Sequence, residues 1–171
     1  MATTSALNWY VLVTRSRHEK KCNELLRKKG FEVFLPLQKV MREWSDRKKE
    51  IELPLFSGYL FIRYEEARRL EVLNIPGIVR FIRYNQQDAI IPETQIQAVR
   101  LALQNMKSVE VTDQKFSQGQ EITIKSGPFK GLFGKIIQYK GKRKILVSID
   151  AIGKALLIEL GKTQIEKTLT K

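Results

Sequence analysis

Apolar and polar positions alternate in two different ways along the chain, and the change divides it. Residues 9–106 mix strand-like alternation with apolar residues at helical spacing, whereas residues 119–167 hold short β-favouring runs separated by glycines. Between them, residues 107–118 are polar and have no sustained period, which is typical of a linker. The pattern therefore predicts a first domain over 1–106, a linker over 107–118 and a second domain over 119–171.

Strands and helices are predicted to alternate in the first domain. Ser16 and Glu19 have the spacing of a capping box, which predicts a helix that begins directly after the serine, and Gly30 is suited to end it. Apolar spacing predicts two further helices, at 65–73 and 93–106. Extended segments are predicted at 9–15, 31–35, 38–44, 49–53, 57–64 and 78–84. This order indicates an α+β domain, in which helices flank a mostly antiparallel sheet.

The second domain is predicted to be a small all-β barrel. Its expected strands are 120–125, 134–139, 144–149 and 155–159, with Gly- or Pro-containing turns between them. A segment of about 50 residues is near the lower limit for independent folding. Closing the sheet into a barrel would help, because it removes exposed sheet edges.

Composition narrows the functions that such a chain can have. Its 171 residues carry 31 Lys and Arg against 18 Asp and Glu, a formal net charge of +13, which favours polyanionic partners such as nucleic acid. No apolar run approaches the ~20 residues of a bilayer-spanning helix, so no membrane association is expected. The single cysteine, Cys22, allows no intrachain disulfide, and the first eight residues show no secretory signal pattern. We therefore expect a cytoplasmic protein.

Catalytic chemistry has few candidates in the sequence. The single histidine, His18, has no evident triad partners, and the chain holds no nucleophile elbow and no paired-cysteine metal spacing. The glycine-rich run 127–134 lacks the Gly-Lys-Ser/Thr ending of a phosphate-binding loop. We interpret His18 as a solvated helix-start residue and Cys22 as a core residue. No enzyme activity, metal or cofactor is expected.

An aromatic strand within residues 55–64 is the most informative feature. Its alternate positions are apolar on both sides of the strand, so one face can serve the core. The other face is either covered by the predicted helices or left as a docking surface for a partner protein, and the pattern leaves both alternatives open. The two sets are Leu60, Ile62 and Tyr64 on one side, and Tyr59, Phe61 and Arg63 on the other.

Basic residues gather at the start of the first predicted helix. Arg15, Arg17 and Lys21 bring like charges to the end of the helix where the dipole is already positive. Phosphate contacts would offset that repulsion, which indicates a nucleic-acid partner. Arg68 and Arg69 form a second basic pair, on the next helix.

Four segments together resemble the NusG superfamily of transcription elongation factors. They are Trp9-Tyr-Val-Leu-Val, Leu55-Phe-Ser-Gly-Tyr-Leu-Phe-Ile, Ile75-Pro-Gly-Ile-Val-Arg-Phe and the KOW-like Gly127-Pro-Phe-Lys-Gly-Leu-Phe-Gly. The resemblance covers nearly the whole chain and implies an NGN-like domain followed by a KOW barrel with an SH3-like fold. The stretch Arg42-Glu-Trp-Ser-Asp-Arg-Lys-Lys, with Val79-Arg-Phe-Ile-Arg-Tyr, looks more like the RfaH-type paralogues, particularly the UpxY antiterminators of capsular polysaccharide operons.

This resemblance implies a monomeric factor that docks on the clamp helices of the RNA polymerase largest subunit. It would suppress pausing and termination. The apolar docking surface would map to Val11, Val13, Phe56, Tyr59, Phe61, Ile82 and Tyr84. The residues expected to face non-template or upstream DNA are Arg15, Arg17, Lys21, Arg68 and Arg69.

The resemblance also implies partners for the barrel. Phe129 matches an apolar loop residue with which the family's KOW barrel engages a ribosomal small-subunit protein or the Rho factor, and burial beneath the turn is the alternative for this side chain. Nascent RNA is a further partner for the lysine-rich surface. Ser57 stands where the family commonly has proline, which would loosen the turn before the aromatic strand. We expect the C-terminal half to be a β-barrel rather than the helical hairpin of RfaH.

Two functions therefore compete. The leading hypothesis is an operon-specific antiterminator that binds RNA polymerase through the first domain. The alternative is a KOW-type RNA-binding protein of ribosome assembly or translation, which would bind RNA tightly without polymerase.

Overall fold

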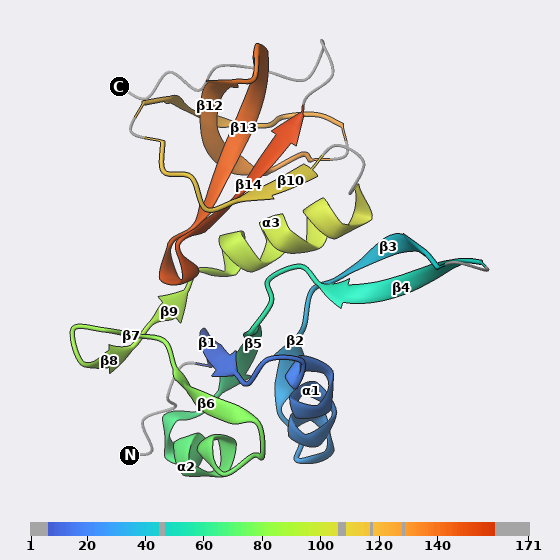
Figure 1. Cartoon of the computed structure of the whole chain (residues 1–171). Helices are drawn as coiled ribbons and strands as arrows, with labels where there is room; N and C mark the ends of the chain where they lie inside the picture. The colour runs from blue at the N-terminus through green and yellow to red at the C-terminus, as the bar shows by residue number, and fades with distance from the viewer. Residues whose placement is uncertain (1–6, 45–46, 106–108, 117, 128, 160–171) are drawn as a thin grey trace. The chain divides into compact units, whose positions relative to one another are not determined.

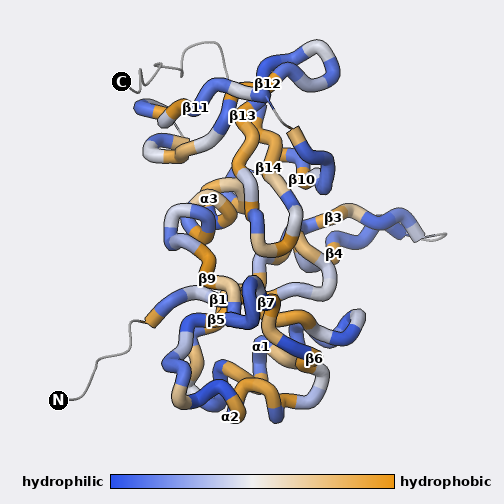
Figure 2. Tube along the Cα trace, turned by 90° about the vertical axis from the view of Figure 1, so that its left-hand side faces the viewer, coloured by the Kyte–Doolittle hydropathy of each residue, from blue (hydrophilic) through white to orange (hydrophobic). Residues whose placement is uncertain are grey.

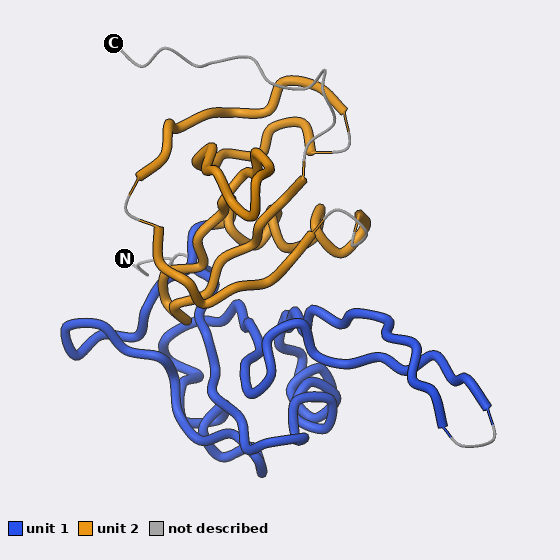
Figure 3. The backbone as a smooth tube through the Cα atoms, turned by 45° about the horizontal axis from the view of Figure 1, so that its top comes forward, with its two compact units in different colours: residues 1–92 blue, residues 93–171 orange. Residues whose placement is uncertain are grey.

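The computed structural model describes residues 7–44, 47–105, 109–116, 118–127 and 129–159 (Figure 1). It divides the chain into two compact units, residues 1–92 and 93–171, which are coloured separately in Figure 3. Within the described ranges, none of the helices has the length and apolar character that a bilayer crossing requires.

Unit 1 is built on a five-stranded antiparallel sheet with β1 at its centre. Strand order is β2-β5-β1-β6, and β9 also pairs with β1. The register places Leu12 opposite Leu60, with Phe81 on its other side. The strands are β1 (Asn8–Thr14), β2 (Glu32–Phe34), β5 (Tyr59–Tyr64), β6 (Ile78–Phe81) and β9 (Ile90–Ile91).

Two helices cover one face of this sheet. They are α1 (Glu19–Lys28) and α2 (Arg69–Leu73), the latter preceded by a 3-10 turn at Glu66–Arg68. Their apolar side chains meet those of the sheet in one buried core, because both elements must remove an apolar face from water. The core includes Cys22, Leu26 and Val72 from the helices, and Leu12, Leu60, Ile62, Tyr64 and Phe81 from the sheet.

Helix α1 begins differently from the predicted capping box. Arg17 has a left-handed φ of 63°, so the chain turns after Ser16, and His18 becomes the N-cap without a side-chain cap hydrogen bond. The carboxylate of Glu19 accepts the backbone N–H of Gly58 instead, at 2.7 Å. The capping-box prediction is therefore wrong, whereas the predicted left-handed Gly30 after the helix is confirmed by its φ of 80°.

Two hairpins complete unit 1. Strands β3 (Leu37–Glu43) and β4 (Lys48–Pro54) form a sheet of their own, which extends away from the main sheet in Figure 1. Strands β7 (Arg83–Tyr84) and β8 (Gln87–Asp88) form a smaller hairpin. Its turn residues Asn85 and Gln86 both have positive φ, which suits a tight hairpin turn. The predicted strand 78–84 is thus divided between β6 and β7.

Unit 2 is a five-stranded antiparallel sheet with one long helix, α3 (Glu93–Gln104). The strands follow the order β10-β14-β13-β12-β11, and Figure 2 shows hydrophobic stretches within β13 and β14. A 3-10 turn at Asp150–Ile152 joins these two strands. The strands are β10 (Val109–Thr112), β11 (Gln120–Thr123), β12 (Phe133–Tyr139), β13 (Lys142–Ile149) and β14 (Lys154–Glu159).

The predicted fold class is confirmed, but the division of the chain differs from the sequence interpretation. Strand β10 lies inside the predicted linker, because Val109 and Val111 pair with Ile158 and Leu156 of β14. Helix α3 was expected in the first domain and belongs to unit 2, where it packs against β13 and β14. The described part of residues 109–159 is β-rich, as predicted, and not a helical hairpin.

Candidate interaction surfaces

The sheet of unit 1 has a second face, on the side away from α1 and α2, that is lined with apolar and aromatic side chains. Register pairs Val11 with Phe61 and Val13 with Tyr59, so these four residues share that face. Phe34 lies opposite Phe61 on the next strand, and the two rings stack with centroids 5.9 Å apart. The predicted alternation of the aromatic strand is therefore confirmed, with both faces apolar.

Exposure differs strongly among the residues predicted to form the docking surface. Phe56 packs edge-on against Phe61, 6.1 Å between centroids, so these two rings shield each other. Tyr84, in the small β7–β8 hairpin, is 75% exposed and offers the most accessible ring of the set. Val11, Phe56 and Phe61 are buried, Val13, Tyr59 and Ile82 are half-buried, and Tyr84 is exposed.

The turn before β5 is fixed to two neighbouring elements. The N–H of Gly58 donates to the Glu19 carboxylate of α1, and the carbonyl of Gly58 accepts the N–H of Thr14 in β1 at 2.9 Å. Gly58 has a φ of 82°, a conformation that favours glycine. Ser57 was expected to loosen this turn, yet the backbone contacts on its neighbour hold the turn in place.

The basic group at the start of α1 is open to solvent. Arg15, Arg17 and Lys21 are all exposed, and the described part of the chain records no ion pair for them. The nearby carboxylate of Glu19 is buried and bound to Gly58, so it does not neutralise them directly. This group, which we call the α1 cluster, keeps its charge available for an anionic partner.

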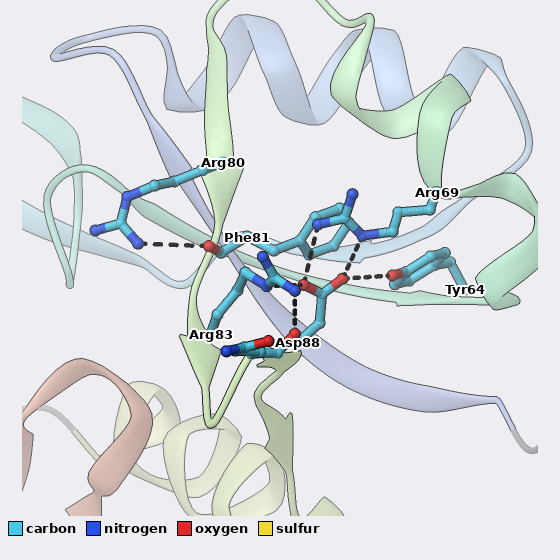
Figure 4. Close-up of polar contacts among 7 residues, drawn as sticks. Tyr64, Arg69, Arg80, Phe81, Arg83 and Asp88 are labelled. Atoms are coloured by element: carbon cyan, nitrogen blue, oxygen red, sulfur yellow. Dashed lines mark hydrogen bonds and ion pairs between the residues drawn. The ribbon is translucent and has the colours of Figure 1, made fainter.

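Arg69, in contrast, is engaged within the unit (Figure 4). Its guanidinium donates to both carboxylate oxygens of Asp88, at 2.7 Å from Nε and 3.1 Å from Nη2. The hydroxyl of Tyr64 donates to the same carboxylate at 3.1 Å, and Arg83 Nε lies 3.6 Å from it. Asp88 thereby joins β5, α2 and the β7–β8 hairpin through one side chain that is only 10% exposed.

The Asp88 contacts also change the acidity of their partners. Burial, reinforced by the Asp88 carboxylate, raises the pKa of Tyr64 well above its usual range. The hydrogen bonds to Asp88 raise the pKa of Arg69, which is already charged at every physiological pH. Arg69 also lies over the ring of Phe81, 5.1 Å from its centroid. The hydrogen bonds to Asp88 and the contact with the Phe81 ring together keep Arg69 in its intramolecular site.

Arg68 is similarly occupied. It forms a two-pronged pair with Glu71, at 3.0 and 2.9 Å, and its Nη2 donates to the carbonyl of Lys29 at 3.0 Å. Its guanidinium lies 4.0 Å from the centroid of the Phe31 ring. Of the five residues predicted to face DNA, the α1 cluster is therefore open, whereas Arg68 and Arg69 hold elements of unit 1 together.

The glycine-rich turn of unit 2 buries one phenylalanine and exposes another. Phe129 is 3% exposed beneath the turn, which is the alternative that the sequence left open for it, whereas Phe133 is 54% exposed. Phe133 borders a groove of about 620 Å³ between α3 and β12–β13, with Lys130 and Lys135 beside it. The sequence analysis missed Phe133, although its place at the start of an alternating strand is a signal for exposure.

Cys22 and His18, the side chains with reactive groups, both contact backbone carbonyls. Cys22 is buried, burial raises the pKa of its thiol, and the thiol lies 3.5 Å from the carbonyl of Pro76. The ring of His18 contacts the carbonyl of Ser16 at 3.0 Å. Among the residues that the structure describes, no group of three or more His, Cys, Asp or Glu side chains could hold a metal ion.

Comparison with known proteins finds a family model and relatives of one description. The family model described as "Transcription termination factor nusG" matches residues 7–100. The chain is 30% identical to the "Transcription termination/antitermination protein NusG" of Pasteurella multocida, over 97% of its own length and 98% of the relative's. A protein of the same description from Halalkalibacterium halodurans is 27% identical, over 94% and 98% of the two chains.

A likeness to solved structures supports the fold. One of them is described as "Domain interaction in Thermotoga maritima NusG", with a TM-score of 0.50 and 22% identity, and the match covers 91% of this chain and 93% of the other. The likeness is one of architecture, and it agrees with an α+β unit followed by a β-rich unit.

Proposed function

The chain belongs to the NusG family, and from this premise we propose that it is a transcription elongation and antitermination factor that acts by binding RNA polymerase. Its relatives' descriptions support a role in transcription. A factor of this kind makes and breaks no bond. It needs to bind one state of the enzyme more tightly than another, and a preference of about 1.4 kcal/mol shifts such an equilibrium tenfold.

The observation that carries the proposal is the second face of the unit 1 sheet. One face of that sheet is already packed on two helices, so the aromatic residues on the other face have no role in that core. We propose that this second face docks on the clamp helices of the polymerase largest subunit. Tyr84, Tyr59, Val13 and Ile82 supply the accessible part of the surface, and Val11, Phe56 and Phe61 form the apolar layer beneath it.

The charged surfaces of the two units would bind further partners. We propose that the exposed α1 cluster faces non-template or upstream DNA, because its exposed cations match a phosphate backbone. Arg68 and Arg69 support that surface by holding α2 and the β7–β8 hairpin in place. In unit 2, the lysine-rich sheet would engage a ribosomal small-subunit protein, the Rho factor or nascent RNA. The exposed Phe133, rather than the buried Phe129, is its accessible aromatic residue.

We also propose that the factor serves particular operons, such as capsular polysaccharide loci, rather than transcription in general. The support is the likeness of residues 42–49 and 79–84 to RfaH-type and UpxY sequences. Mapping the factor along the chromosome of its host tests this directly. Occupancy confined to a few operons is expected, and occupancy at most transcribed genes would leave a general elongation factor.

Affinity capture of core RNA polymerase tests the docking surface. Tyr59→Ala and Tyr84→Ala are expected to lower the amount of polymerase retained in high salt, because each removes an aromatic ring from the proposed docking surface, Tyr59 from the second face of the sheet and Tyr84 from the β7–β8 hairpin. Leu70→Ala is the matched control, since Leu70 is an apolar residue of α2 with 72% exposure. Equal retention by all variants would contradict the proposal, and capture of RNA without polymerase would favour the KOW-type RNA-binding alternative.

A further inference from the structure

The β3–β4 hairpin separates its charged residues between two faces. Its register pairs Lys39 with Glu52, Arg42 with Lys49 and Glu43 with Lys48, and opposed residues share a face of the ribbon. Beyond the last strand pair, the backbones of Trp44 and Arg47 exchange hydrogen bonds of 2.8 and 3.3 Å. Trp44 and Arg47 therefore continue the face of Arg42 and Lys49.

One side, the paired face, is neutralised from within. It consists of Lys39, Met41, Glu43, Lys48, Glu50 and Glu52. Lys39 forms an ion pair with Glu50 at 2.9 Å, and Lys48 pairs with Glu43 at 2.6 Å. Glu52 lies 3.9 Å from Lys20 of α1. The cations of this face are therefore matched by carboxylates.

The other side, the basic face, is built differently. It consists of Gln38, Val40, Arg42, Trp44, Arg47, Lys49, Ile51 and Leu53, and none of these is acidic. Arg42, Arg47 and Lys49 are exposed, and no ion pair is recorded for them among the described residues. Between them, the large aromatic side chain of Trp44 is 59% exposed. Figure 2 colours the outer part of the hairpin hydrophilic.

We propose that this basic face binds single-stranded nucleic acid, with Trp44 stacked on an unpaired base and with Arg42, Arg47 and Lys49 on the flanking phosphates. The three cations supply charge complementarity to a phosphodiester backbone. An aromatic ring can stack only on a base that is free of its duplex neighbours, which selects single strands over duplex. The proposal is independent of polymerase binding, and it adds a site to the α1 cluster.

The free protein is sufficient for the test. Trp9 is buried and Trp44 is exposed, so quenching of tryptophan fluorescence by added oligothymidine or oligouridine reports mainly on Trp44. Strong quenching is expected with a single strand and weak quenching with the corresponding duplex. RNA and DNA single strands offer the same phosphates and unpaired bases, and comparison of the two oligonucleotides identifies the preferred one.

Variants separate a true site from general attraction to a basic protein. By fluorescence anisotropy of the labelled oligonucleotide, Trp44→Ala is expected to weaken binding roughly tenfold. The double variant Arg42→Ala with Lys49→Ala is expected to reduce the slope of log affinity against log salt by about 1.4, or about 0.7 for each phosphate contact.

The matched control lies on the paired face of the same hairpin. The double variant Lys39→Ala with Lys48→Ala also removes two positive charges from this ribbon. It is expected to bind nearly as tightly as the unmodified protein. Equal losses in the two double variants would show attraction to net charge and would overturn the site. Duplex binding as tight as single-strand binding, with Trp44→Ala unaffected, would overturn it as well.

Discussion

Glu19 is a buried carboxylate that accepts a hydrogen bond from a distant part of the chain. It lies in the first turn of α1 with 5% of its surface exposed, and it receives the N–H of Gly58, 39 residues further along. The turn that it holds precedes β5, the strand that carries Tyr59 and Phe61 of the second face. This hydrogen bond joins α1 to the turn before β5, and it thereby helps to position the proposed docking residues of that strand.

Removing this acceptor should therefore destabilise unit 1. Glu19→Ala leaves the N–H of Gly58 without its partner, at an expected cost of about 1–3 kcal/mol in the free energy of unfolding. Glu19→Gln keeps an acceptor oxygen and should lose less. Urea denaturation followed by circular dichroism measures both, with the exposed Glu24→Ala as control on the same helix. The role would be refuted if Glu19→Ala and Glu24→Ala had the same small effect.

Tyr64 makes the folding stability of unit 1 depend on pH. Burial and Asp88 raise its pKa in the folded protein, whereas an unfolded tyrosine ionises at about 10. The stabilisation linked to this shift is fully present below that unfolded pKa, and it is lost as the pH rises toward the folded pKa. In a near-ultraviolet titration, Tyr64→Phe should remove a late portion of the phenolate signal, and Asp88→Asn should move that portion to lower pH. A late portion that survives in Tyr64→Phe would contradict the assignment.

At the level of elements, the periodic parts of the sequence were predictable. The alternation of the aromatic strand predicts both faces of β5, because a strand side chain can point to only two sides. The four-residue strand β10 was missed, because its Val-Glu-Val-Thr alternation is too short to stand out from a polar segment. The capping box failed for a different reason, since the Glu19 carboxylate is bound to Gly58, 39 residues away, a contact that no local pattern contains.

The candidate site was predictable to a similar extent. The sequence pattern indicates the apolar second face and the basic start of α1. It does not indicate that Arg68 and Arg69, which were expected to face DNA, have carboxylate partners within unit 1. Asp88, the sole acidic residue between Glu71 and Glu93, was a local signal for such a partner. The distances from Asp88 to Arg69 and Tyr64 depend on how β5, α2 and the β7–β8 hairpin pack, which the sequence pattern does not provide.

A glycine in β12 tests the packing of the second sheet. A Cβ added at Gly134 would lie 2.6 Å from Cγ2 of Ile145 and 2.6 Å from the carbonyl oxygen of Leu146. Gly134→Ala is therefore expected to cost about 1–3 kcal/mol of stability by overpacking. Thermal unfolding followed by circular dichroism measures it, and the exposed Ser148→Ala on β13 serves as control. A variant as stable as this control would show that β12 can move away from β13.

For the whole molecule, interactions made by the net charge of +13 and by the apolar second face are expected to respond differently to salt. Charge attracts nucleic acid over a distance of about one Debye length, roughly 8 Å at physiological salt. Burial of apolar surface does not weaken in salt in this way. A complex with polymerase that survives high salt would thus depend on the sheet, while contacts of the α1 cluster and the β3–β4 hairpin would weaken.

Site-specific photocrosslinking within the transcription elongation complex tests the central claim most directly. A photoreactive phenylalanine analogue placed at Tyr59 or Tyr84 should crosslink to the clamp helices of the polymerase largest subunit, and the same group at Leu70 on α2 should not. If the complex formed and Leu70 crosslinked to the clamp helices while Tyr59 and Tyr84 did not, docking through the second face would be contradicted.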